Sequence, residues 1–197
     1  MKTEDLNYTA RLLHQPWWKR MFDVQRPYRN HIQSLNLGPV LEIGCGIGRN
    51  LINLGARKQD IGVDHNPTSV NECNQRGLSA FTPNEFLASS YAKPQSFDAL
   101  LVAHVMEHLT EDEALGLLKT YTPFIKGDGK IIIITPQEAG YASDPTHVTM
   151  MNHSRVSKIL KEFCGSSIKQ YSFPFPQIVG KVFKYNENIS IGKMHKR

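Results

Sequence analysis

Apolar and polar positions alternate in a regular way from Leu37 onward. Short apolar runs there are separated by segments whose apolar residues recur at helical spacing, which predicts strands and helices in turn. This alternation is typical of an α/β fold with a largely parallel sheet. The predicted strands cover residues 40–43, 60–63, 78–82, 97–103 and 129–135.

Two helices have the clearest signals. Thr110 and Glu113 have the spacing of a capping box, and apolar residues follow at i, i+3, i+4 and i+7 over 114–121. A turn at 127–129 is expected to separate this helix from the next strand. A second helix is predicted over 156–163 from the same apolar spacing.

The two ends of the chain have different patterns. After Gly165, two extended stretches at 167–174 and 182–191 are joined by a short loop, so they must pair antiparallel and end the sheet in a hairpin. Residues 1–36 carry no strand signal. We therefore predict an N-terminal helical cap over 1–36, with the aromatic residues Trp17 and Trp18, and one domain over 37–197.

Composition narrows the class of protein. The chain has 197 residues, of which 40% are hydrophobic and 21% charged, and this balance excludes disorder for most of it. The longest apolar run is too short to cross a bilayer, and no signal peptide is evident at the N-terminus. Three widely spaced cysteines fit reduced thiols. We expect a cytoplasmic protein.

The net charge of +5 is unevenly distributed. Residues 1–37 contribute +3 and residues 166–197 contribute +5, whereas residues 38–165 contribute −3. The basic excess therefore belongs to the two ends, and it leaves an interaction with nucleic acid open as an alternative.

The strongest local signal is the stretch VLEIGCGIGRN at 40–50, an apolar strand followed by Gly44, Gly46 and Gly48. Alternate glycines allow a sharp turn and a close approach of a ligand to the backbone. The spacing differs from the dinucleotide fingerprint G-x-G-x-x-G, and Glu42 precedes the loop. A carboxylate there would repel a pyrophosphate but suits an ammonium group, which disfavours an NAD-dependent oxidoreductase.

Asp64 ends the next predicted strand, about twenty residues past the loop. Doubly wound folds place at this position an acid that accepts hydrogen bonds from ribose hydroxyls. Asp64 could instead begin the helix that follows, as an N-cap. Together, the loop and the acid indicate a nucleoside-like ligand with a cationic tail.

Three stretches of the chain, 40–50, IGVDHN at 61–66 and FDALLVAHVMEHL at 97–109, closely resemble those of the class I S-adenosylmethionine (SAM)-dependent methyltransferases. The resemblance covers about residues 38–190. It implies SAM as the cofactor and a Rossmann-like, mostly parallel seven-stranded sheet, with helices on both faces and an antiparallel C-terminal hairpin strand.

The resemblance also implies positions that bind the cofactor. The family usually has an Asp near the adenine after the third strand, but this chain reads Pro-Asn-Glu-Phe there, which leaves three residues open for that contact. Cys45 is expected to pack beneath the cofactor. The implied positions are Glu42, Gly44, Cys45, Gly46, Arg49, Asp64, His65, Asn84, Glu85, Phe86, Ala103 and His104.

Several histidines follow the fourth and fifth predicted strands, where doubly wound sheets bind their ligands. Methyl transfer to a hydroxyl or a protonated nitrogen needs a proton acceptor, and histidine suits that task near neutral pH. We predict that His104 and His147 act as the base or orient the acceptor, with Asp144 holding an imidazole tautomer. His104 could instead serve only to hydrogen-bond the loop backbone.

A metal site is an alternative here. A helix beginning near His104 would place His104, Glu107 and His108 on one face, and His147 could approach from the next loop. The quinone-biosynthesis O-methyltransferases and the small-RNA 2′-O-methyltransferases look similar, with E-x-x-E-H and a later histidine. Because His104 stands where they have the first Glu, our prediction for the site contains no metal.

The sequence thus predicts a SAM-dependent methyltransferase that acts on O or N of a small, partly apolar acceptor. Aromatic residues and methionines in the N-terminal segment, at 141–151 and at 171–176 favour such an acceptor over a phosphate-rich one. We expect a monomer or homodimer with no membrane contact and no nucleic acid. The alternatives are an RNA or tRNA methyltransferase and a non-catalytic SAM-binding regulatory protein.

Overall fold

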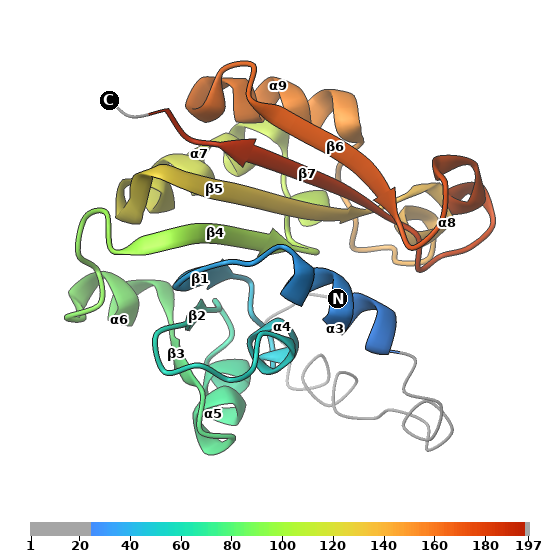
Figure 1. Ribbon diagram of the computed structural model, residues 1–197. Coiled ribbons are helices and arrows are strands. Elements are labelled where there is room, and N and C mark those ends of the chain that lie inside the picture. Colours follow the sequence, from blue (N-terminus) through green and yellow to red (C-terminus); the bar gives the residue numbers. More distant parts are fainter. Residues whose placement is uncertain (1–24, 196–197) are drawn as a thin grey trace. The chain divides into compact units, whose positions relative to one another are not determined.

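The structure is a computed structural model that describes residues 25–195. The chain divides into two compact units, Met1–Ala92 and Lys93–Arg197, and each is described by itself. Figure 1 gives the elements of both.

The first unit contains three short parallel strands in the order β3-β2-β1. Leu41 of β1 is paired with Ile61 of β2, which in turn is paired with Ser79 of β3. All four residues of β1 and all three of β2 are buried, as the apolar runs predict. The elements are α3 (Arg26–Ser34), β1 (Val40–Ile43), α4 (Arg49–Asn53), β2 (Ile61–Val63), α5 (Pro67–Gln75), β3 (Ser79–Phe81) and α6 (Pro83–Ala88).

The second unit contains four strands in the order β4-β5-β7-β6. β5 is parallel to β4, whereas β7 is antiparallel to both of its neighbours, β5 and β6. The elements are β4 (Phe97–Ala103), the 3-10 turn η1 (Met106–His108), α7 (Glu111–Tyr121), η2 (Thr122–Phe124), β5 (Ile125–Pro136), α8 (Glu138–Ala142), α9 (His153–Cys164), β6 (Ile168–Phe173), η3 (Gln177–Lys181) and β7 (Glu187–Lys193).

The two units together contain seven mostly parallel strands, as in the Rossmann-like type, and the second unit ends in an antiparallel C-terminal hairpin. The predicted fold class is therefore confirmed. β4 begins and ends at the predicted residues, and α7 begins with the predicted capping box, in which Glu113 Oε2 accepts a hydrogen bond from Thr110 N at 2.8 Å. The central residues of β4 and β5 are fully buried and form the core of the second unit.

Two strand boundaries differ from the prediction by more than two residues. β5 begins at Ile125, and the predicted turn at 127–129 is a bulge within it: Phe97 is paired with Ile125, but Ala99 is paired with Lys130. Gly129 makes this possible, because a Cβ there would lie 2.9 Å from the carbonyl oxygen of Asp98. Residues 127–129 therefore do not form a turn between α7 and β5 but belong to β5 itself.

The second wrong boundary is the start of β7, at Glu187 and not at residue 182. The fully buried Asn186 fixes this start. Its Nδ2 donates to Gln137 Oε1 at 3.0 Å and to Phe175 O at 3.2 Å, and its Oδ1 accepts from Phe175 N at 2.9 Å. Residues before Asn186 are therefore held in a loop and cannot join the strand.

The predicted N-terminal cap lies mostly outside the described residues, because Trp17, Trp18 and the rest of 1–24 are not described. Its last part is helical, as α3. The boundary predicted between 36 and 37 stays a prediction. Among residues 25–195, no helix has both the length and the apolar character needed to cross a bilayer. The cytoplasmic localisation also stays a prediction.

Candidate cofactor and acceptor sites

The glycine loop of the first unit lies between β1 and α4. Gly44, Gly46 and Gly48 all have positive φ angles, of 73°, 52° and 78°, a region that other residues rarely adopt. The loop is tied to β2, because Gly44 N donates to Val63 O at 2.7 Å. A Cβ at Gly48 would also overlap Leu78 Cδ1. Glycine is therefore required here by both conformation and space.

Asp64 follows β2 and is buried against the glycine loop. Its Oδ2 accepts a hydrogen bond from Gly46 N at 2.7 Å, and its Oδ1 accepts one from Asn66 N at 2.9 Å. The N-cap of α5 is Asn66, whose side chain accepts from Thr68 N, so Asp64 is not the cap. Asp64, the residue predicted to hold the ribose, is instead hydrogen-bonded to the glycine loop.

Glu42 is buried in β1, just before the loop. Its Oε1 accepts from Asn50 Nδ2 at 2.7 Å, whereas its Oε2 is buried without a hydrogen-bond partner among the described residues. Burial raises the pKa of Glu42 from 4.5 to about 8, despite the opposing hydrogen bond from Asn50. A cationic group of a ligand would satisfy this oxygen and stabilise its charge. The residue therefore fits the ammonium group of SAM.

Cys45 lies within the loop and packs against β2, because a Cβ at Gly62 would lie 2.7 Å from its Sγ. The sulfur of Cys73 on α5 lies 3.1 Å from Gly46 O and donates to it. Hydrogen bonding to Cys73 and burial raise the pKa of the Cys45 thiol. Its geometry is that of a packing residue under the loop, and its predicted place beneath the cofactor stays a prediction.

The remaining predicted cofactor residues of the first unit have varied positions. Arg49 begins α4, and His65 is half exposed, with Nδ1 3.7 Å from Asp64 Oδ1. Of the three candidates for the adenine contact, Phe86 is fully buried, and Glu85 Oε2 accepts from Thr82 N at 2.8 Å within the capping box of α6. Asn84 is neither fully buried nor part of the capping box.

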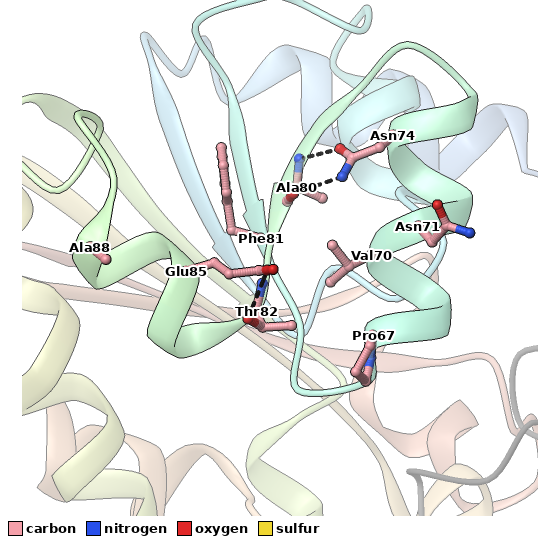
Figure 2. A pocket seen from close by; sticks show the side chains of 9 residues that line it. All are labelled: Pro67, Val70, Asn71, Asn74, Ala80, Phe81, Thr82, Glu85 and Ala88. Atoms are coloured by element: carbon pink, nitrogen blue, oxygen red, sulfur yellow. Dashed lines mark hydrogen bonds between the residues drawn. The ribbon is translucent and has the colours of Figure 1, made fainter.

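A cavity of about 580 Å³ lies between α5, β3 and α6 (Figure 2). Asn74 closes one side of it, since its side chain donates to Ala80 O at 3.0 Å and accepts from Ala80 N at 2.9 Å. Neither the glycine loop nor Asp64 lines this cavity, so it is separate from the predicted ribose position. Its lining is Pro67, Val70, Asn71, Asn74, Ala80, Phe81, Thr82, Glu85 and Ala88.

In the second unit, His104 follows β4 directly after the buried Ala103 and has a positive φ of 56°. Its Nε2 lies 2.9 Å from Glu187 Oε1, and its Nδ1 lies 3.4 Å from Glu107 Oε1. Burial lowers the pKa of His104, but the two carboxylates outweigh this effect and raise it to about 10. Both ring nitrogens face carboxylates, an arrangement that fits an orienting role, and the catalytic role of His104 stays a prediction.

The positive φ of His104 also excludes a helix beginning there, which was the condition of the alternative metal site. The following turn is the short 3-10 segment η1, and α7 begins only at Glu111. Glu107 and His108 are instead brought together with His147: each of the three offers one ligand atom, and these atoms all lie within 4.8 Å of one another. The rings of His108 and His147 have their centroids 4.8 Å apart.

Asp144 does not hold an imidazole directly. Its Oδ1 accepts from Thr146 N at 2.9 Å and from Thr146 Oγ1 at 2.7 Å. Burial raises the pKa of Asp144, but these hydrogen bonds and the nearby histidines lower it overall. The tautomer of His147 is fixed by the carbonyl oxygen of Tyr141, to which Nδ1 donates at 2.7 Å. Asp144 thus acts on the loop that carries His147.

Sequence reasoning missed several partners of the candidate residues. Glu187 begins β7, 83 positions after His104, and no local spacing relates the two. Asn50 could have been noticed, because it lies only eight positions after Glu42 within the same motif. Tyr141 and Thr146 act through the backbone or a hydroxyl group, which no sequence motif marks.

Comparison with known proteins agrees with this architecture. Residues 40–129 match the family model described as a methyltransferase domain. An uncharacterized methyltransferase of Bacillus pumilus is 32% identical over 95 residues, which are 47% of this chain and 44% of that protein, so the match spans less than half of the relative.

Solved structures resemble the whole chain. A SAM-dependent methyltransferase from Archaeoglobus fulgidus has a TM-score of 0.69 at 20% identity, over 96% of this chain and all of that one. Magnesium protoporphyrin IX methyltransferase from Synechocystis, with bound S-adenosylhomocysteine (SAH), has a TM-score of 0.64 at 13% identity, over 98% and 96% of the two chains. These likenesses concern the fold.

The sheet, the glycine loop and the acid after β2 define a Rossmann-like domain of the methyltransferase type. Residues 40–129 match a methyltransferase domain, and the chain shares its fold with SAM-dependent methyltransferases of known structure, one of which holds SAH. The resemblance seen in the sequence is therefore confirmed.

Proposed function

We propose that this protein transfers the methyl group of SAM to an oxygen or nitrogen atom of a small-molecule acceptor. The observation that carries the proposal is the buried Oε2 of Glu42 beside the glycine loop, which has no hydrogen-bond partner within residues 25–195. A dinucleotide would bring a pyrophosphate to this loop, but a sulfonium cofactor brings an ammonium group that pairs with the carboxylate. Asp64 would then hold the ribose hydroxyls.

The chemistry is an in-line displacement at the methyl carbon. A lone pair of the acceptor forms the new bond as the carbon–sulfur bond breaks, and the electron pair of that bond stays on sulfur, which gives SAH. An acceptor hydroxyl also loses a proton. When Nε2 of His147 carries no metal ion, it can take this proton, because Nδ1–H is held by Tyr141 O and the lone pair of the ring is then on Nε2.

The class of acceptor is supported by the surface of the second unit. Several large apolar side chains are exposed in the loop before β7, and Val182 and Ile178 are the most exposed, at 85% and 73%. Apolar surface of this kind favours a partly apolar small molecule over a polyanion. This loop exposes Phe175, Ile178, Val182 and Tyr185, and Val148 is exposed in the loop after α8.

Calorimetric titration of the purified protein with SAM, SAH and NAD tests the proposal. We expect SAM and SAH to bind, and both to lose affinity in Asp64→Ala but not in Glu162→Ala, which removes an exposed helix carboxylate. Binding of NAD in place of SAH would refute the cofactor assignment. If RNA were the acceptor, its affinity would fall steeply with salt, whereas a small molecule would bind almost independently of salt.

A further inference from the structure

We propose that Glu107, His108 and His147 bind one divalent transition-metal ion, Zn²⁺ or Mn²⁺. The three candidate ligand atoms all lie within 4.8 Å of one another. Ligands about 2.1 Å from a shared ion lie at most about 4.2 Å apart, so the cluster closes on an ion with side-chain shifts of under about 1 Å. Binding of the ion stands on this geometry, whereas its role in catalysis rests on the proposed methyl transfer.

The carboxylate of Glu107 lacks a partner that a cation would supply. The residue is 1% exposed. Its Oε1 faces His104 Nδ1 at 3.4 Å, while Oε2 is buried without a hydrogen-bond partner among residues 25–195. A buried carboxylate oxygen without a partner is unfavourable unless a charge or a hydrogen bond compensates it. A bound cation removes this deficit.

Both histidines are held in the tautomer that a metal requires. His147 Nδ1 donates to Tyr141 O at 2.7 Å, and His108 Nδ1 donates to Thr146 O at 3.2 Å. Each neutral ring therefore keeps its lone pair on Nε2. Metal-binding histidines almost always have their other ring nitrogen fixed in this way, by a carbonyl or carboxylate oxygen.

The backbone keeps the two segments that carry these residues together. Val148 N and Thr149 N both donate to Glu107 O, at 2.8 and 3.1 Å, so the loop with His147 is bound to η1. Thr135 Oγ1 donates to Met151 O at 2.7 Å and anchors the end of the same loop to β5. The ligand set is thus largely formed in advance, which favours affinity.

The donor atoms select the class of metal. Mg²⁺ and Ca²⁺ prefer oxygen ligands, whereas two imidazole nitrogens and one carboxylate suit Zn²⁺, Mn²⁺ or Fe²⁺. His104 is not a ligand, because both of its ring nitrogens face carboxylates. Three protein ligands leave a coordination position open, where an acceptor hydroxyl would bind and acidify before attacking the methyl group.

The test begins with the full-length protein, stripped of metal by a chelator and titrated calorimetrically with Zn²⁺, Mn²⁺ and Mg²⁺. We expect one equivalent of Zn²⁺ or Mn²⁺ to bind and Mg²⁺ to bind far more weakly. Substitution with Co²⁺ should give an absorption spectrum typical of nitrogen and oxygen coordination. Failure of Zn²⁺ and Mn²⁺ to bind stoichiometrically would overturn the proposal.

Variants locate the site. His108→Gln, His147→Gln and Glu107→Gln should each abolish stoichiometric binding, whereas His153→Gln, which changes a half-buried histidine outside the cluster, should preserve it. His104→Gln should weaken binding by about tenfold without abolishing it, because His104 only orients a ligand. Complete loss in His104→Gln, or equal loss in His153→Gln, would contradict the three-ligand site.

SAM binding by the same samples separates the two proposals. Binding of SAH without any metal binding would overturn the metal site and leave the proposed function standing. If the metal binds but neither SAM nor SAH does, the proposed function is overturned and the metal site stands. Circular dichroism of each variant checks that its fold is retained.

Discussion

One carboxylate connects the two cofactor segments of the first unit: Asp64 Oδ2 accepts from Gly46 N at 2.7 Å, and Oδ1 accepts from Asn66 N at 2.9 Å. The loop after β1 and the turn after β2 are therefore fixed relative to each other without a ligand. Such organisation in advance reduces the ordering that binding must supply. Asp64 combines this positioning with the proposed hydrogen bonds to ribose.

Asp64→Asn should therefore weaken SAM and SAH binding more than it weakens the fold. The amide keeps one acceptor oxygen and loses the charge, and hydrogen bonds to charged groups contribute about 1.5–3 kcal/mol each, so we expect an affinity loss of about 10- to 100-fold. Calorimetry measures it. Asn66→Ala is the matched control: it removes the cap of α5, at a cost of about 1 kcal/mol in stability, but no proposed ligand contact. An equal loss of affinity in both variants would assign Asp64 a purely structural role.

Glu42 should make SAM binding depend on pH. Its pKa of about 8 means that the carboxyl is mostly protonated at pH 7 in the free protein. Pairing requires a charged carboxylate and a charged ammonium group, whose pKa is itself about 8, so SAM affinity should rise from pH 6 to about 8 and binding at pH 7 should release a proton. Titration in buffers of different ionisation enthalpy measures the proton. Glu42→Gln should remove both effects, and an unchanged pH profile in this variant would contradict the pairing.

Glu42 should also make the stability of the free protein depend on pH. Here the stability falls as the pH rises, whereas the affinity for SAM increases. The pKa of Glu42 is 4.5 when unfolded and about 8 when folded, so between these values the folded state holds more protons. The free energy of unfolding should therefore fall as pH rises from about 5 to 8. Urea unfolding at several pH values measures this slope, which should flatten in Glu42→Gln and in the presence of saturating SAM. A slope that stays the same in Glu42→Gln would assign it to other groups.

The sequence predicted the sheet well because its strands are nearly uniform apolar runs bounded by turn residues. The start of β7 was missed, because Asn186 acts through contacts with Gln137 and Phe175 that are distant in sequence. Most of the predicted cofactor residues lie in short local motifs after β1, β2 and β3, so they could be proposed from the sequence, and they stay predictions. The acceptor side is assembled from η1, the loop after α8 and the start of β7, and only the fold brings Glu187 to His104.

The exposed apolar loop before β7 should affect the acceptor and not the cofactor. Ile178→Ser and Val182→Ser change side chains that are 73% and 85% exposed, so each should alter stability by at most about 0.5 kcal/mol. We expect both to raise the KM for the acceptor, once one is found by screening phenols and amines, and to leave the affinity for SAH unchanged. Leu87→Ser, an exposed apolar position in α6, is the control. An unchanged KM would remove this surface from the acceptor site.

Gly48 and Gly77 form a matched pair for testing the glycine loop. Their φ angles are 78° and 77°, but a Cβ at Gly48 would overlap Leu78 Cδ1, whereas one at Gly77 would meet nothing within 4 Å. Gly77→Ala should incur only the conformational cost, about 1–2 kcal/mol, and thus lower Tm by about 2–8 °C. Gly48→Ala should lower Tm further, because Leu78 must move, and should also weaken SAH binding by displacing the loop. Since the backbone cost is common to both variants, equal Tm values would mean that Leu78 yields freely and that only conformation requires glycine at position 48.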